Sequence, residues 1–166
     1  MPEIAYLSLG SNIGDREKHL RGAIERLAAI GQVVSTSSFY ETEPVEFTSQ
    51  GWFLNCAVAV ETTKTPQELM AALLHIEEEM GRRRTQNKGP RTIDLDILLF
   101  GSAVIDSPLK DSPQLKVPHP AMAERRFVLE PLVEIAPEAL HPILKKTARQ
   151  LLDALPAGQV VRKTSF

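Results

Sequence analysis

The sequence predicts an α+β domain, a sandwich in which helices pack on one face of a mainly antiparallel sheet. Four segments rich in β-branched and apolar residues fit strands, and two segments with apolar residues at helical spacing fit amphipathic helices. They follow in the order β-α-β-β-α-β, which is the order of ferredoxin-like folds. The 166 residues, 43% of them hydrophobic, are expected to build one core and a single domain, 1–166.

The first half of the chain supplies a strand, a helix and two further strands. Asp15 is placed to cap the helix, because an Asp side chain accepts hydrogen bonds from the free N–H groups of a first turn. Gly31 is a stop signal, and the long loop with Pro44 is typical of binding loops. The expected ranges are a strand at 4–9, a helix at 16–30, a strand at 33–40, a loop at 41–51 and a strand at 52–61.

The second half adds a helix, the closing strand of the unit and a C-terminal extension. Thr65, Pro66 and Glu68 form the signature of a capping box with proline at the first helical position. Prolines beyond Gly101 predict an irregular stretch. The expected ranges are a helix at 66–81, a strand at 93–100, a short strand at 104–105, helices at 127–135 and 147–155, and a closing strand or tail at 159–162.

Composition excludes several classes of function. A net charge of −2 and a pI of about 6.1 argue against a nucleic-acid-binding protein. The single cysteine, Cys56, excludes a disulfide within the chain. No segment reaches the roughly 18 apolar residues of a membrane span. The N-terminus also lacks the charged region and following apolar region of a signal peptide. A cytoplasmic monomer that binds neither membrane nor nucleic acid is expected.

An acidic pair stands where the predicted closing strand begins. Side chains alternate along a strand, so Asp94 and Asp96 share one face while Leu95 points to the other. Two neighbouring carboxylates repel unless cations neutralise them, and Mg²⁺ prefers such oxygen ligands. For an Asp-x-Asp pattern alone, a solvated strand face is the simpler interpretation.

A cluster of basic residues just upstream of the acidic pair favours a phosphate ligand. Arginine binds phosphate oxygens with two hydrogen bonds, and Mg²⁺ bridges phosphates to carboxylates. A polyphosphate is a ligand that needs both kinds of group. The basic residues are Arg82, Arg83, Arg84, Lys88 and Arg91.

Seven motifs occur in order along the chain, at residues 9–15, 41–44, 53–55, 81–84, 89–98, 118–120 and 126–129. From residue 5 to about 137 the sequence with these motifs resembles the 6-hydroxymethyl-7,8-dihydropterin pyrophosphokinase family. That family transfers the β,γ-diphosphate of ATP to the hydroxymethyl group of the pterin and releases AMP, a step of folate biosynthesis. The resemblance also implies a ferredoxin-like fold.

The resemblance implies a role for each matching residue. Two Mg²⁺ ions are expected on Asp94 and Asp96, with Arg82 and Arg91 as catalytic arginines beside ATP. The expected pterin-binding residues, with two phenylalanines sandwiching the ring, are Thr42, Pro44, Val45, Phe53, Asn55, Asp94 and Phe127. The expected ATP-binding residues are Leu74, Glu77, Arg82, Arg84, Lys88, Arg91, Ile97, His119 and Arg125.

Three positions depart from the common pattern of the family. Glu46, Gly51 and Lys88 stand where many members have glycine, proline and tryptophan. Closure over ATP is therefore expected to depend on the charge of Lys88 instead of on aromatic stacking.

Two other classes of function are also compatible with the residues themselves. A nucleotidyltransferase uses acidic pairs on a related sheet to hold two metals, and it would release pyrophosphate. A non-catalytic module of the same fold would bind a ring between Phe53 and Phe127 without turnover. Such a module has no need of the acidic pair together with the arginines.

Overall fold

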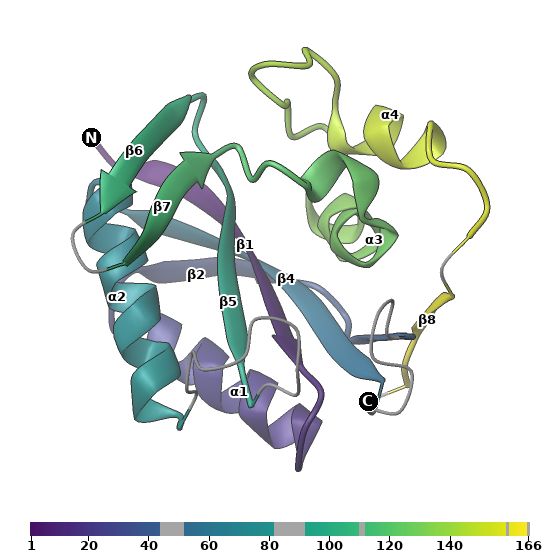
Figure 1. The fold of residues 1–166 in the computed structure, drawn as a ribbon, viewed down its shortest axis with the longest axis horizontal. Coiled ribbons are helices and arrows are strands. Elements are labelled where there is room, and N and C mark those ends of the chain that lie inside the picture. Colours follow the sequence, from purple (N-terminus) through teal and green to yellow (C-terminus); the bar gives the residue numbers. More distant parts are fainter. Residues whose placement is uncertain (44–51, 82–91, 110–111, 159, 166) are drawn as a thin grey trace.

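The computed structural model describes residues 1–43, 52–81, 92–109, 112–158 and 160–165 (Figure 1). Several residues of the predicted sites lie outside these ranges. They are Pro44 and Val45, Arg82, Arg84, Lys88 and Arg91, and the departures Glu46 and Gly51. Their predicted roles therefore stay predictions.

Six strands of the described ranges form one sheet, and all their pairings are antiparallel, as predicted. The order is β5-β1-β4-β3-β8, and β2 also pairs with β4. The strands are β1 (Glu3–Ser11), β2 (Gln32–Thr36), β3 (Tyr40–Thr42), β4 (Phe53–Thr62), β5 (Asp94–Phe100) and β8 (Val161–Lys163). The closing strand β5 therefore lies at one edge of the sheet and β8 at the other.

Helices cover both faces of the sheet. On one face, α1 (Arg16–Leu27) and α2 (Pro66–Glu79) enclose the larger hydrophobic cluster. On the other face, α3 (Arg126–Ile135) and α4 (Ala148–Asp153) enclose the smaller one (Figure 1). The expectation of one covered face is thus correct for the βαββαβ unit, and the C-terminal extension covers part of the second face. None of these helices is long and apolar enough to cross a bilayer within the described ranges.

Both predicted helix starts are confirmed in detail. The Asp15 carboxylate accepts a hydrogen bond from the backbone N–H of Lys18 at 3.2 Å. The Thr65 hydroxyl accepts from the Glu68 N–H, and the Glu68 carboxylate accepts from the Thr65 N–H at 2.8 Å, which completes the capping box. Both helices end before their stop glycines, α1 at Leu27 and α2 at Glu79, which is earlier than expected.

The expected single strand at 33–40 is wrong, since the chain forms two strands, β2 and β3, separated by three residues. Ser37 still contacts β4, since its N–H donates to the Ala57 carbonyl at 2.9 Å and its side-chain hydroxyl accepts from the Ala57 N–H at 2.8 Å. Ser38 turns away, because its N–H donates to the carboxylate of Glu134 on α3 at 2.9 Å. The same carboxylate accepts a 2.6 Å hydrogen bond from the Tyr40 hydroxyl. A side chain of α3 therefore breaks the strand.

The stretch after Gly101 is more regular than expected. Residues Ile105–Leu109 (β6) and Ser112–Val117 (β7) form an antiparallel hairpin, which the prolines had argued against. Ile105, Leu115 and Val117 pack against the larger hydrophobic cluster, so the hairpin extends the core beside α2 (Figure 1). A short 3-10 helix (Met122–Glu124) then leads into α3.

Candidate functional site

The predicted alternation along β5 is confirmed. Ile93, Leu95 and Ile97 are buried in the cluster under α1 and α2. Asp94 and Asp96 are half-buried and therefore lie on the opposite face, the one that carries α3. The acidic pair thus occupies the part of this face toward the start of β5.

A single row of residues crosses four strands from this pair. Asp94 lies opposite Gly10, Gly10 opposite Asn55, and Asn55 opposite Tyr40. Residues directly opposite each other in antiparallel strands share a face. Strands are spaced by about 4.8 Å, so the backbones at Asp94 and Asn55 are roughly 10 Å apart, with only the glycine between them.

Gly10 is required for this arrangement. A Cβ atom at this position would lie 2.8 Å from Nδ2 of Asn55 and 3.6 Å from Cδ1 of Phe53. The Asn55 amide therefore leans over the glycine toward the acidic pair. Neither Gly10 nor Tyr40 was among the predicted site residues, because their place on this face depends on the register of neighbouring strands.

Two buried polar atoms of this face have no hydrogen-bond partner in the described part of the chain. They are Oδ1 of Asn55, on a residue 3% exposed, and Oγ1 of Thr42, on a residue 2% exposed. Leaving such atoms unpaired costs about 1–3 kcal/mol each. Both are acceptors, and both belong to the predicted pterin site, so a ligand with N–H donors would satisfy them.

Two aromatic rings flank this polar region. Phe53 lies opposite Thr42 and shares its face. Phe127, at the start of α3, packs against the smaller hydrophobic cluster on the same side of the sheet, with the Arg125 guanidinium 5.6 Å from the ring centroid. Both rings are half-buried. The predicted pair of phenylalanines is thus on the face that also carries Asn55.

Glu77 holds the acidic strand from the opposite face. Its carboxylate, on a residue 2% exposed, accepts a hydrogen bond of 2.7 Å from the backbone N–H of Leu95. Leu95 separates the two aspartates, so this bond fixes the backbone from which both project. Sequence reasoning placed Glu77 near ATP and missed this contact, because nothing local links α2 to β5.

His119 is held beside β5. Its backbone N–H donates to the Leu98 carbonyl at 2.9 Å, and its ring Nδ1 accepts from the Ala121 backbone N–H at 3.1 Å. Burial and, to a smaller extent, the charge of Arg125 lower the pKa of His119, the carboxylate of Asp94 acts in the opposite direction, and the resulting pKa is about 4. The imidazole is therefore neutral at pH 7, with its proton on Nε2.

Because the pKa of His119 is lowered in the folded protein, the free energy of unfolding depends on pH. The folded pKa of His119 lies below its ordinary 6.5, so the unfolded chain binds a proton first as the pH falls. We expect the free energy of unfolding to fall by about 2 kcal/mol between pH 6.5 and 4 from this residue. His119→Asn, which keeps an acceptor for Ala121, is expected to flatten that slope in urea titrations. The exposed His75→Asn is the control, and equal slopes for both variants would contradict the assignment.

The other predicted residues are placed less directly. Leu74 is half-buried on α2, and the side chain of Ile97 is 3% exposed in the core under α1 and α2. No group of three or more His, Cys, Asp or Glu side chains suited to a metal occurs in the described ranges. Asp94 and Asp96 thus offer two carboxylates on one face, and one or two carboxylates are the usual protein contribution where Mg²⁺ also binds substrate phosphates.

Fold and site together define a small α+β domain with an acidic pair, two unpartnered polar atoms and two aromatic rings on one face of its sheet. The sequence model of the 7,8-dihydro-6-hydroxymethylpterin-pyrophosphokinase family matches residues 6–137. The chain belongs to this family and is a pyrophosphokinase of folate biosynthesis, which confirms the predicted family and enzyme class.

Relatives of known name support this assignment. The 2-amino-4-hydroxy-6-hydroxymethyldihydropteridine pyrophosphokinase of Bacillus subtilis is 51% identical over 138 residues, covering 81% of this chain and 79% of the relative. That of Aquifex aeolicus is 41% identical, covering 87% and 88%. The folic acid synthesis protein fol1 of Schizosaccharomyces pombe is 41% identical over 99% of this chain, which spans only 22% of fol1.

Solved structures confirm the fold. The HPPK-DHPS protein of Plasmodium falciparum superposes with a TM-score of 0.76 over 92% of this chain and 45% of its own, at 18% identity. At this identity the similarity supports a shared α+β architecture alone.

Proposed function

We propose that this chain transfers the diphosphate of ATP to the hydroxymethyl group of 6-hydroxymethyl-7,8-dihydropterin and releases AMP. The observation that carries the proposal is the row Asp94–Gly10–Asn55. In this row an amide acceptor without a described partner and a carboxylate share one face, and their backbones are roughly 10 Å apart with a glycine between them. A bicyclic heterocycle lying on this face would have one end hydrogen-bonded to Asn55 and its reacting end near Asp94.

The pterin is held by polar and aromatic groups of this face. Oδ1 of Asn55 and Oγ1 of Thr42 accept hydrogen bonds from ring N–H groups, which relieves their buried, unpartnered state. Phe53 and Phe127 stack on the ring. Pro44 and Val45 are proposed to complete the pocket, as the resemblance implies.

The acidic pair fits the binding of Mg²⁺. Asp94 and Asp96 offer carboxylate oxygens on one face, and they would hold two ions together with the phosphates of ATP. When bound, the ions neutralise phosphate charge and favour in-line displacement at phosphorus. Arg82 and Arg91 are proposed to stabilise the charge that develops on the transferred diphosphate, with Arg84 and Lys88 binding ATP.

ATP is proposed to lie along the outer edge of β5. His119 and Arg125 are beside this edge, with Nε2–H of the neutral imidazole as a donor to phosphate oxygen. Leu74 lies on α2, which packs on the same strand. Ile97 keeps its side chain in the core, so its contribution is made by the backbone.

Glu77 is proposed to act through β5, as a positioning residue. Glu77→Ala leaves the Leu95 N–H buried without an acceptor, so we expect about 2 kcal/mol lower stability and roughly tenfold lower kcat. Glu77→Gln retains an acceptor and is expected to keep most of the activity. The exposed Glu79→Ala on the same helix is the control. Thermal unfolding and steady-state kinetics measure both effects, and a Glu77→Ala enzyme that matches the control would refute the tether.

The βαββαβ core is proposed to be ferredoxin-like. In support, β1 lies between β4 and β5, and β2 and β3 pair on the far side of β4. A monomeric state and a cytoplasmic location stay predictions from the sequence.

The proposed reaction is tested by incubating the chain with ATP, Mg²⁺ and the pterin, followed by chromatography of the nucleotides. Pterin-dependent AMP is the expected product, and chelation of Mg²⁺ by EDTA should abolish it. Release of pyrophosphate would support a nucleotidyltransferase instead. Binding of the pterin without any nucleotide product would support a non-catalytic module.

A further inference from the structure

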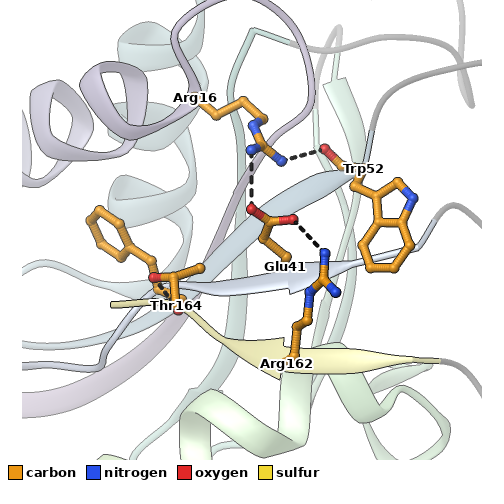
Figure 2. Close-up of polar contacts among 6 residues, drawn as sticks. Arg16, Glu41, Trp52, Arg162 and Thr164 are labelled. Carbon is orange, nitrogen blue, oxygen red and sulfur yellow. Dashed lines mark hydrogen bonds and ion pairs between the residues drawn. The ribbon is translucent and has the colours of Figure 1, made fainter. Parts of the chain in front are cut away.

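The C-terminal strand β8 extends the sheet beyond the short strand β3. Tyr40, Glu41 and Thr42 pair with Lys163, Arg162 and Val161, respectively. Beyond the strand, Thr164 donates two hydrogen bonds to the Phe39 carbonyl, from its N–H at 2.8 Å and its hydroxyl at 2.9 Å (Figure 2). The three residues of β3 pair with β4 on one side and with β8 on the other, so β8 supplies one of the two sides of its pairing.

Charged side chains reinforce this pairing on the face that carries α1. Figure 2 shows the Glu41 carboxylate between two guanidinium groups, Arg16 at 3.4 Å and Arg162 at 3.5 Å. Arg162 also lies over the Trp52 ring, 4.8 Å from its centroid, and Arg16 donates to the Trp52 carbonyl at 2.9 Å. These groups line an open surface pocket, so truncation of Arg162 leaves no internal cavity.

Two residues next to the pterin site are thus held by the same C-terminal segment. Glu43, which follows β3, donates its N–H to the Val160 carbonyl at 3.3 Å and accepts from the Val160 N–H at 2.9 Å. Trp52, which precedes β4, is covered by Arg162. Their neighbours Thr42 and Phe53 lie opposite each other on the pterin face.

We propose that β8 positions the pterin pocket and that Arg162 is its positioning residue. Glu41 points to the α1 face, so the ion pair cannot reach the pterin, which the proposed function places on the other face. It acts through the backbone of β3, fixing the Thr42 hydroxyl, and through Trp52, fixing the adjacent Phe53. This inference rests on the pterin site of the proposed function.

Arg162→Ala tests the proposal by comparing the two substrates. We expect KM for the pterin to rise roughly threefold to tenfold, the range for one cation–π contact with an exposed ion pair, while KM for ATP and kcat change less than about twofold. Trp52 is the only tryptophan of the chain, so its fluorescence reports loss of the contact directly. Arg162→Lys, which keeps the charge, should restore part of the pterin KM.

Arg149→Ala is the matched control, because Arg149 forms an exposed ion pair with Asp153 on α4, outside the pterin pocket. Deletion of residues 160–166 is a second variant, and it should raise the pterin KM further. An Arg162→Ala enzyme with the pterin KM of the control would overturn the proposal. Equal increases in KM for the pterin and KM for ATP, together with a lower unfolding temperature, would also overturn it, because they would indicate that β8 has only a structural role. Failure of the proposed function is seen separately, as absence of pterin-dependent AMP from the unaltered chain.

Discussion

Replacing Asp96 by asparagine is expected to lower kcat for pterin-dependent AMP formation by about 10³-fold. Asparagine has nearly the same shape as aspartate but no negative charge, so it binds Mg²⁺ far more weakly. Loss of a group that stabilises charge in a transition state typically costs 10²–10³-fold in rate. Asp94→Asn is expected to behave similarly and, because Asp94 is opposite Gly10, to weaken pterin binding as well.

Single-turnover kinetics over a range of Mg²⁺ concentrations would measure this effect. A shift of the Mg²⁺ dependence to higher concentration distinguishes loss of a metal ligand from a loss of folding. Asp153→Asn, an exposed substitution on α4, serves as the control. Full activity of Asp96→Asn at low Mg²⁺ would remove the acidic pair from the mechanism.

Asn55→Ala is expected to weaken pterin binding by roughly 10- to 100-fold. Its Oδ1 has no partner in the described part of the chain, so the hydrogen bond it makes is expected to be with the ligand. One such bond is worth about 1.5–3 kcal/mol when its loss leaves a buried donor unpaired. Because the amide contacts the ring in ground and transition states alike, KM should rise with little change in kcat.

Calorimetric titration with the pterin measures that loss. Stability should change little, since Oδ1 of the amide makes no described bond. Thr62→Ala, at the other end of β4, removes a hydroxyl that accepts from the Lys64 N–H and is the control for effects on the strand. Asn55→Ala would have a structural role if it lowered the unfolding temperature more than the control and left pterin affinity unchanged.

Features governed by local rules could be predicted from the sequence. The capping box at Thr65 depends on residues three apart, and the common face of Asp94 and Asp96 depends on the period of a strand. Asn55 follows a local rule as well, since a polar residue in an apolar strand needs a hydrogen-bond partner.

Features that depend on distant residues could not be predicted in this way. The break before Tyr40 arises because Glu134 takes the N–H of Ser38, and these two residues are far apart in sequence. The bond from Leu95 to Glu77 links a strand to a helix for the same reason. The β6–β7 hairpin forms although prolines disfavour it, because its apolar residues extend the core.

Gly10 has a consequence for how this pocket can change through mutation. Any side chain at position 10 collides with the amide of Asn55 at 2.8 Å, so the glycine cannot be replaced while that amide keeps its place. Replacement of Asn55 alone removes the acceptor that we propose for the pterin. The two positions are therefore tied together, and substitutions that alter the proposed pocket without removing its acceptor would have to arise at other positions.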